Sequence, residues 1–177
     1  MKSHAPYLYQ ISVSDGGVPK SAVPEAQVTV EGLAGDRQRN RQIHGGPDRA
    51  VCLYSLEVIT ALRAEGHAIT PGASGENLTI AGLEWAAIRP GDVLIIGSAV
   101  RLEILSYTSP CRFNAQWFLH GDYSRISQQR HPGSSRLYAR VLGEGLVRQG
   151  DPVRVESNHV HQERDDDGAS AGAGIDG

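Results

Sequence analysis

The sequence predicts a mainly β domain with a few short helices, folded as a closed or nearly closed antiparallel β-barrel. Many short runs alternate between apolar and polar residues and are rich in β-branched side chains, as strands are. Glycine-containing turns separate these runs, and only one segment has a clear helical period. Many short strands joined by tight turns are typical of small barrels. Gly-Asp pairs mark three of the turns, at Gly35-Asp36, Gly91-Asp92 and Gly150-Asp151.

The expected strands follow one another closely along the chain. Gly97 and Ser98 separate two of them and are the residue types of a tight hairpin turn. Residues 50–54 form a further apolar run, in which we expect Cys52 to be a small core residue. The other strands are expected at residues 7–13, 26–30, 78–80, 92–96, 99–105, 137–142, 146–147 and 152–155.

One helix is clearly indicated after the apolar run. Ser55 is a typical N-cap, apolar residues recur on one face after it, and Gly66 is a typical stop. Two weaker helices are expected at residues 114–120 and 123–129, and Pro132 prevents the second from continuing. Helices are therefore expected to be few and short.

The composition indicates one folded domain. The chain has 177 residues, 40% of them hydrophobic, and a net charge of -3. It can bury a core, and it has no overall attraction for nucleic acid or an acidic membrane. Residues 1–156 are expected to fold, whereas residues 157–177 are acidic and then rich in Gly, Ala and Ser, as a disordered tail would be. The lack of a leader and of a long apolar run favours a cytoplasmic location, and a homodimer is compatible with the sequence.

Three loop segments carry side chains that suit a ligand. Two glycines precede Lys20, which is either an ordinary surface lysine or the counter-charge of an anion that the glycines let approach. His44 is followed by Gly45 and Gly46, so it is either a turn histidine or a side chain with room for a ligand, where it could carry a proton or bind an anion or metal. Asn77 follows a polar turn and could contact the edge of a heterocycle.

Cys111 has the strongest chemical signal. It follows Pro110 after an expected strand, precedes an expected helix and lies beside Arg112. This setting favours the thiolate, which attacks electrophiles and binds soft metals, although a packed structural cysteine is the other interpretation. Because Cys52, Cys111 and His44 are dispersed, a four-ligand zinc site is disfavoured. A nucleophilic pair of Cys111 and His44 would require the fold to bring them together.

Taken together and in order, these segments resemble the MOSC family, named after the C-terminal domain of molybdenum cofactor sulfurases. The chain is similar to the small stand-alone bacterial members over roughly residues 20–155. The matching segments are Gly17-Val18-Pro19-Lys20, Gly35-Asp36, His44-Gly45-Gly46-Pro47-Asp48-Arg49-Ala50-Val51, Gly75-Glu76-Asn77-Leu78, Gly91-Asp92, Ser109-Pro110-Cys111, Leu137-Tyr138 and Gly150-Asp151.

The resemblance implies a mostly β barrel that binds a pterin molybdenum cofactor (molybdopterin) in a cleft. It makes Cys111 the protein ligand to molybdenum, with His44, as a catalytic residue, or a water as the source of protons. The residues that would anchor the anionic, heterocyclic cofactor are then Lys20, His44, Gly45, Gly46, Asn77, Arg112 and Asn114.

Relatives in this family reduce N-hydroxylated compounds, including hydroxylaminopurine bases, with electrons from donor proteins. The resemblance therefore implies a molybdenum-dependent reductase of a small N-hydroxylated substrate, supplied by an electron-donor reductase protein. Two alternatives stay open: a non-catalytic carrier that holds the cofactor or sulfur on Cys111, and a metal-free thiol protein that uses Cys111 and His44.

Overall fold

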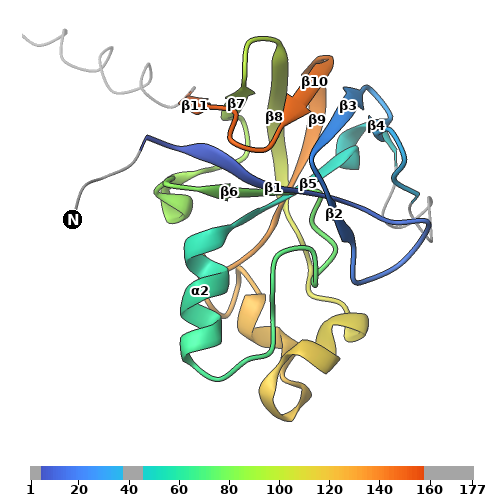
Figure 1. The fold of residues 1–177 in the computed structure, drawn as a ribbon. Coiled ribbons are helices and arrows are strands. Elements are labelled where there is room, and N and C mark those ends of the chain that lie inside the picture. The colour runs from blue at the N-terminus through green and yellow to red at the C-terminus, as the bar shows by residue number, and fades with distance from the viewer. Residues whose placement is uncertain (1–4, 38–45, 158–177) are drawn as a thin grey trace, which may run out of the picture.

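The computed structural model describes residues 5–37 and 46–157, which form a mainly β fold (Figure 1). The predicted strands are all present, and the first has the predicted bounds. The short strands β2 and β4 were not predicted, because two or three residues are too few to show a period. The strands are β1 (Tyr7–Val13), β2 (Ser21–Val23), β3 (Glu25–Thr29), β4 (Gly32–Leu33), β5 (Val51–Ser55), β6 (Leu78–Ala81), β7 (Val93–Ile96), β8 (Val100–Tyr107), β9 (Leu137–Gly143), β10 (Gly145–Arg148) and β11 (Val153–Glu156).

The strands form two sheets, and the described residues contain no closed barrel, whereas the prediction was of a closed or nearly closed one. The larger sheet has eight strands in the order β11-β7-β8-β9-β5-β6-β1-β2, and the smaller has the order β10-β3-β4. Within the described residues no ladder joins the outer strands of the larger sheet, because β3, β4 and β10 pair with one another instead. The start of β1 does reach the turn before β11, where Leu8 N donates to Asp151 O at 2.8 Å and Gly150 N donates to Leu8 O at 2.7 Å.

One pair of strands is parallel, which corrects the prediction of a wholly antiparallel sheet. β5 and β6 run in the same direction, with Leu53 opposite Leu78. The predicted helix, α2 (Leu56–Ala64), lies between them in the chain, and parallel neighbours need such a crossover. Its N-cap is Ser55, whose Oγ accepts a hydrogen bond from Val58 N at 3.2 Å, as predicted.

The two weaker helices are 3₁₀ helices and not α-helices. They lie at η3 (Arg112–Trp117), η4 (Leu119–Gly121) and η5 (Tyr123–Ile126). Phe118 has an extended backbone, with a φ of -112° and a ψ of 143°, so the predicted segment 114–120 divides into two turns at this residue. These turns and α2 lie together on one side of the sheets (Figure 1). Two further 3₁₀ turns are η1 (Pro47–Arg49) and η2 (Trp85–Ala87).

The core is built from the central strands. Every residue of β5, β6 and β7 is buried, whereas the first six residues of β8 alternate between buried and partly exposed positions. β7 and β8 form the predicted hairpin, with Ile96 opposite Val100. No helix among the described residues is both long and apolar enough to cross a bilayer. The predicted tail begins at Ser157, and its residues 158–177 lie outside the described residues, so the tail stays a prediction.

Candidate functional site

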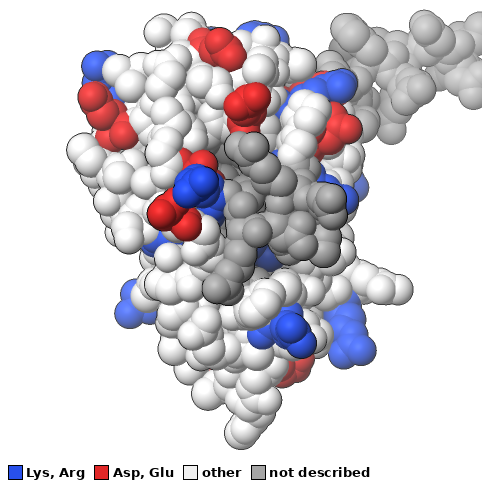
Figure 2. Space-filling view, turned by 90° about the vertical axis from the view of Figure 1, so that its right-hand side faces the viewer, with Lys and Arg blue, Asp and Glu red and all other residues white. Residues whose placement is uncertain are grey.

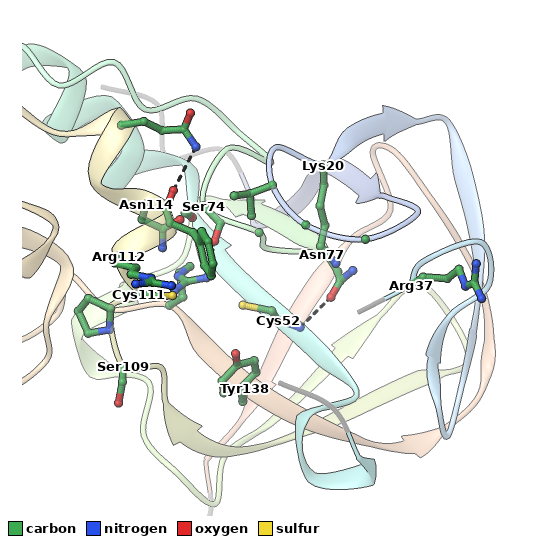
Figure 3. Close-up of a pocket in the computed structure, with 18 residues that line it drawn as sticks. Lys20, Arg37, Cys52, Ser74, Asn77, Ser109, Cys111, Arg112, Asn114 and Tyr138 are labelled. Carbon is green, nitrogen blue, oxygen red and sulfur yellow. Dashed lines mark hydrogen bonds between the residues drawn. The ribbon is translucent and has the colours of Figure 1, made fainter. Parts of the chain in front are cut away.

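A cavity of about 940 Å³ lies where the larger sheet meets the 3₁₀ segment (Figure 3). Its walls come from four parts of the chain: the loop before β2, the loop before β6, residues 109–116 after β8, and the junction that begins β9. Arg37 and Cys52 complete the wall. A volume of this size is at the upper end of small-molecule and cofactor sites.

Cys111 lies on the wall of this cavity, as a functional cysteine should. It is partly exposed and occupies the N-cap position of η3, where its carbonyl oxygen accepts a hydrogen bond from Asn114 N at 2.8 Å. The predicted helix start after Cys111 is therefore confirmed, although the helix is a six-residue 3₁₀ turn. The thiol is accessible to a ligand in the cavity and is not a packed structural cysteine.

Cys52 also lines the cavity, which the sequence did not indicate. It is buried, as predicted, but Figure 3 shows its sulfur pointing across the cavity toward Cys111. Burial raises the pKa of the Cys52 thiol to about 11, although the nearby Arg136 charge opposes this shift. Cys52 therefore stays a neutral thiol near pH 7, unlike a metal-binding thiolate.

Tyr138 forms a further part of the wall beside the two cysteines. Its hydroxyl points into the cavity in Figure 3, and the guanidinium of Arg49 lies over its ring, 5.7 Å from the centroid. Burial, and then the neighbouring Cys52, raise the pKa of Tyr138 to about 12. The phenol stays protonated at neutral pH, so it can donate a hydrogen bond toward a bound group. The sequence signal was the Leu137-Tyr138 pair, to which no role was given.

The charged side chains of the wall are all basic. Among the described residues the lining contains Lys20, Arg37, Arg112 and Arg136 and no Asp or Glu, although the net charge of the chain is -3. On the face in Figure 2, basic side chains also prevail over the lower, helical part of the molecule. A cavity lined in this way favours an anionic ligand.

Two of these four cations have acidic partners. Lys20 Nζ lies 2.5 Å from Asp36 Oδ2, with both side chains more than nine-tenths buried. Arg37 pairs with Asp15 at 3.1 Å on the exposed surface. Asp36 therefore neutralises part of the charge that Lys20 was predicted to offer to an anion. Arg112 lies over the ring of Phe113, with its guanidinium carbon 5.3 Å from the centroid.

The side chain of Asn77 connects three segments beneath the cavity. Its Oδ1 accepts from Cys52 N at 3.1 Å, and its Nδ2 donates to Asp36 Oδ2 at 2.8 Å and to Ser12 O at 3.3 Å. Asn77 lines the cavity as predicted, but its amide is engaged within the protein. Asn114 differs, because it is 2% exposed and its Oδ1 has no hydrogen-bond partner among the described residues.

The remaining predicted residues lie within or beside residues 38–45, which the structure does not describe. His44 and Gly45 are outside the described residues, so their predicted roles stay predictions. Gly46 is the N-cap of η1 and has a φ of 95°, a conformation that glycine adopts without strain. It is not among the described residues that line the cavity.

Arg136 is the residue that the sequence analysis missed most completely. It is 6% exposed and directly precedes β9, beside Tyr138 on the cavity wall. No spacing or motif distinguishes it from the other arginines. Only the fold, by burying it in a cavity, gives it significance.

A model of the MOSC domain matches residues 40–154. The chain belongs to the MOSC family. This family is associated with the molybdenum cofactor. The residues of the cavity fit such a group, because they supply one accessible thiol, several cations and a buried amide oxygen that has no partner in the part of the chain that the structure describes. Residues 5–37 and 46–157 contain no cluster of three or more His, Cys, Asp or Glu that could hold a bare metal ion.

Two MOSC relatives have similar sequences. YflK of Bacillus subtilis is 32% identical over 139 residues, or 78% of this chain and 62% of YflK. YiiM of Escherichia coli is 31% identical over 163 residues, or 85% of this chain and 70% of YiiM. The chain thus spans less than two thirds of the length of YflK.

The crystal structures of YiiM proteins have the same fold. The structure of YiiM from Geobacillus stearothermophilus matches with a TM-score of 0.69 and 26% identity, over 88% of this chain and 77% of that protein. YiiM from Escherichia coli matches with a TM-score of 0.63 and 27% identity, over 86% and 70% of the two chains. The likeness extends over most of the domain.

Proposed function

We propose that the cavity binds a pterin molybdenum cofactor through the Cys111 thiolate and that the protein reduces N-hydroxylated compounds. The observation that supports this proposal is the position of Cys111: a partly exposed thiol of a MOSC domain, on the wall of a 940 Å³ cavity whose charged residues are all basic. A soft thiolate suits a metal that already carries sulfur ligands. The basic wall suits a cofactor that carries a phosphate.

The residues around Cys111 have separate tasks in this proposal. Arg112 and Asn114 would hold the cofactor, since they follow Cys111 on the same turn and line the cavity. Lys20 would contribute the donors that Asp36 leaves unused. Tyr138 would donate a hydrogen bond from its protonated hydroxyl. Once bound, the molybdenum centre would supply the two electrons and the oxygen acceptor that cleavage of an N–O bond requires.

Electrons would come from another protein. The chain has two cysteines, whereas an iron–sulfur cluster takes four protein ligands. We therefore propose an electron-donor reductase as the partner, with His44 or water as the source of protons. A hydroxylaminopurine-type base is the substrate class that we propose.

A second candidate function is that of a carrier, which would hold the cofactor or a sulfur atom on Cys111 for delivery to another enzyme. The partial exposure of Cys111 favours it, because a delivered group must be reached from outside. A carrier and a reductase both need Cys111, but only the reductase turns over a substrate.

Molybdenum analysis of purified protein tests the assignment of the ligand. Wild type, Cys111→Ser and the matched control Cys52→Ala are purified from cells that make the cofactor. Wild type and Cys52→Ala are expected to contain molybdenum, and Cys111→Ser is expected to contain at least about tenfold less, since loss of the only thiolate ligand removes a strong bond. Equal metal in Cys111→Ser and wild type would refute the ligand role of Cys111.

An activity assay then separates the two functions. Molybdenum-loaded wild type is mixed with 6-N-hydroxylaminopurine and a reduced low-potential electron donor, and formation of the amine is followed. Turnover supports the reductase. Stable metal binding without turnover, together with transfer of molybdenum to a cofactor-free acceptor enzyme, would favour the carrier instead.

A further inference from the structure

Arg136 is a buried cation on the wall of the cavity with spare hydrogen-bonding capacity. It is 6% exposed, and its Nη1 donates to the carbonyl oxygen of Ser74 at 2.5 Å. Its Nε is fully buried and has no hydrogen-bond partner among the described residues. A buried donor without a partner costs about 1–3 kcal/mol, and more when charged, so a native protein that keeps one usually has a use for it.

The backbone around Arg136 is fixed from three sides. Tyr54 Oη donates to Ser134 O at 2.9 Å, and Trp85 Nε1 donates to Ser135 O at 2.8 Å. Thr108 N donates to the carbonyl oxygen of Arg136 itself at 2.9 Å. The backbone that carries the guanidinium is therefore held in place, so little conformational entropy of this backbone is lost when a ligand binds.

The charge of Arg136 is only indirectly balanced. Glu76 is fully buried in the same region, but its Oε1 accepts from Gly72 N at 2.7 Å and its Oε2 accepts from Ser74 Oγ at 2.8 Å. No carboxylate of the described residues lies within ion-pair distance of the Arg136 guanidinium. Burial lowers the pKa of Arg136, but Cys52, Tyr138 and Glu76 together raise it by more, so the side chain stays charged.

The space beside the guanidinium is kept open by a glycine. Gly75 has a φ of +95°, and a Cβ there would lie 3.0 Å from a methyl carbon of Val18 and 3.8 Å from Arg136 Nη1. A side chain at position 75 would therefore crowd the approach to Arg136. The charged side chain of Arg112 lines the same cavity. A doubly charged oxyanion gains more from two arginines than a carboxylate does.

We propose that Arg136 forms an oxyanion subsite in the cavity that binds a phosphate monoester group. This subsite deepens the proposed function, and only the identity of the phosphate-bearing molecule rests on that function. Two sources share the chemistry: the phosphate of the cofactor, and the phosphate of a nucleotide substrate. The guanidinium binds either one in the same way.

Inorganic phosphate is the first probe, because it needs neither metal nor turnover. Full-length protein free of cofactor is titrated with phosphate by calorimetry at low ionic strength. We expect Arg136→Met to bind phosphate at least about tenfold more weakly than wild type, because a charged hydrogen-bond donor is lost. Arg140→Met is the matched control, since Arg140 lies exposed on β9 and pairs with Glu103 at 2.7 Å; it should bind like wild type.

Two outcomes would overturn the subsite. One is a wild-type protein that binds no phosphate in the millimolar range, and the other is a folded Arg136→Met that binds it like wild type. If Arg136→Met fails to fold, Arg136→Lys decides, because it keeps the charge but loses the planar fork. Weaker binding by Arg136→Lys supports the subsite, and unchanged binding contradicts it.

Further measurements identify the source of the phosphate. If it belongs to the cofactor, Arg136→Met purifies with less molybdenum than Arg140→Met. If it belongs to the substrate, metal content is unchanged, and metal-loaded wild type binds a purine nucleoside monophosphate more tightly than the nucleoside, a preference that Arg136→Met lacks. If neither of these two differences is observed, the proposal is contradicted. Phosphate binding by a wild type that never acquires molybdenum would refute the proposed function and leave the subsite standing.

Discussion

Two asparagines of the cavity show how residues of one type, both predicted to anchor a ligand, differ in their surroundings. The side chain of Asn77 is engaged by Cys52 N, Asp36 and Ser12. The Oδ1 of Asn114 is buried without a partner among the described residues. The first side chain supports the framework of the cavity, and the second has an acceptor to offer a ligand. Sequence alone does not distinguish them, because the difference lies entirely in tertiary contacts.

We therefore expect Asn77→Ala and Asn114→Ala to fail in different ways. Asn77→Ala removes the hydrogen bonds of Asn77 with Cys52 N, Ser12 O and Asp36 and should lower the free energy of unfolding by roughly 2 kcal/mol. Asn114→Ala should lower it by about 1 kcal/mol or less, but should reduce the molybdenum content of the purified protein. Urea unfolding and metal analysis measure the two effects. Equal losses of stability in the two variants would contradict this division of roles.

The loop before β6 is the element that joins the two sides of the cavity. Gly72 O accepts a hydrogen bond from Lys20 N at 2.9 Å, while Gly72 N donates to Glu76 at 2.7 Å. Gly72 has a φ of +85°, and a Cβ there would lie only 2.6 Å from the carbonyl oxygen of Lys20. The loop can approach Lys20 only because this residue has no side chain.

Gly35 provides a matched control for Gly72. It also has a φ of +85°, but a Cβ there would meet nothing within 4 Å. Backbone strain should lower the free energy of unfolding of both alanine variants by about 1–2 kcal/mol. The clash should lower that of Gly72→Ala by roughly a further 1–3 kcal/mol. Thermal and urea unfolding of the two variants measure this difference. If Gly72→Ala is no less stable than Gly35→Ala, the close approach to Lys20 is not a constraint.

At the scale of the whole molecule, β11 is the structural end of the described domain. It pairs with β7 over four residues, from Val153 opposite Ile96 to Glu156 opposite Val93. We expect a chain that stops after Ser157 to keep the free energy of unfolding of the full chain within about 0.5 kcal/mol. A chain that stops after Gln149 should not fold, since it loses β11. Circular dichroism and urea unfolding compare the three chains. A clear loss of stability on removal of residues 158–177 would show that they belong to the domain.

The sequence predicted local features better than their assembly. Alternating runs located the strands, Ser55 located the helix, and the Ser109-Pro110-Cys111 segment located a thiol that lies on the cavity. The parallel pairing of β5 and β6 and the division of the strands into two sheets were not predicted, because pairing between distant strands leaves no local period. Cys52 and Arg136 were missed for a related reason: which face of a buried segment borders a cavity depends on what packs against it.

The contact of Leu8 with Gly150 and Asp151 sets an order of events for a newly made chain. The ribosome makes β1 well before β11, and the backbone partners of Leu8 emerge only after more than 140 further residues. Until then the first residues of β1, which β2 does not cover, lack these partners, and exposed backbone of this kind pairs readily with other chains. Contacts between residues so far apart also slow the folding of small proteins. The start of β1 is therefore open to wrong pairing until residues 150 and 151 have been made, and a chaperone that shields extended segments would improve the yield of folded molecules.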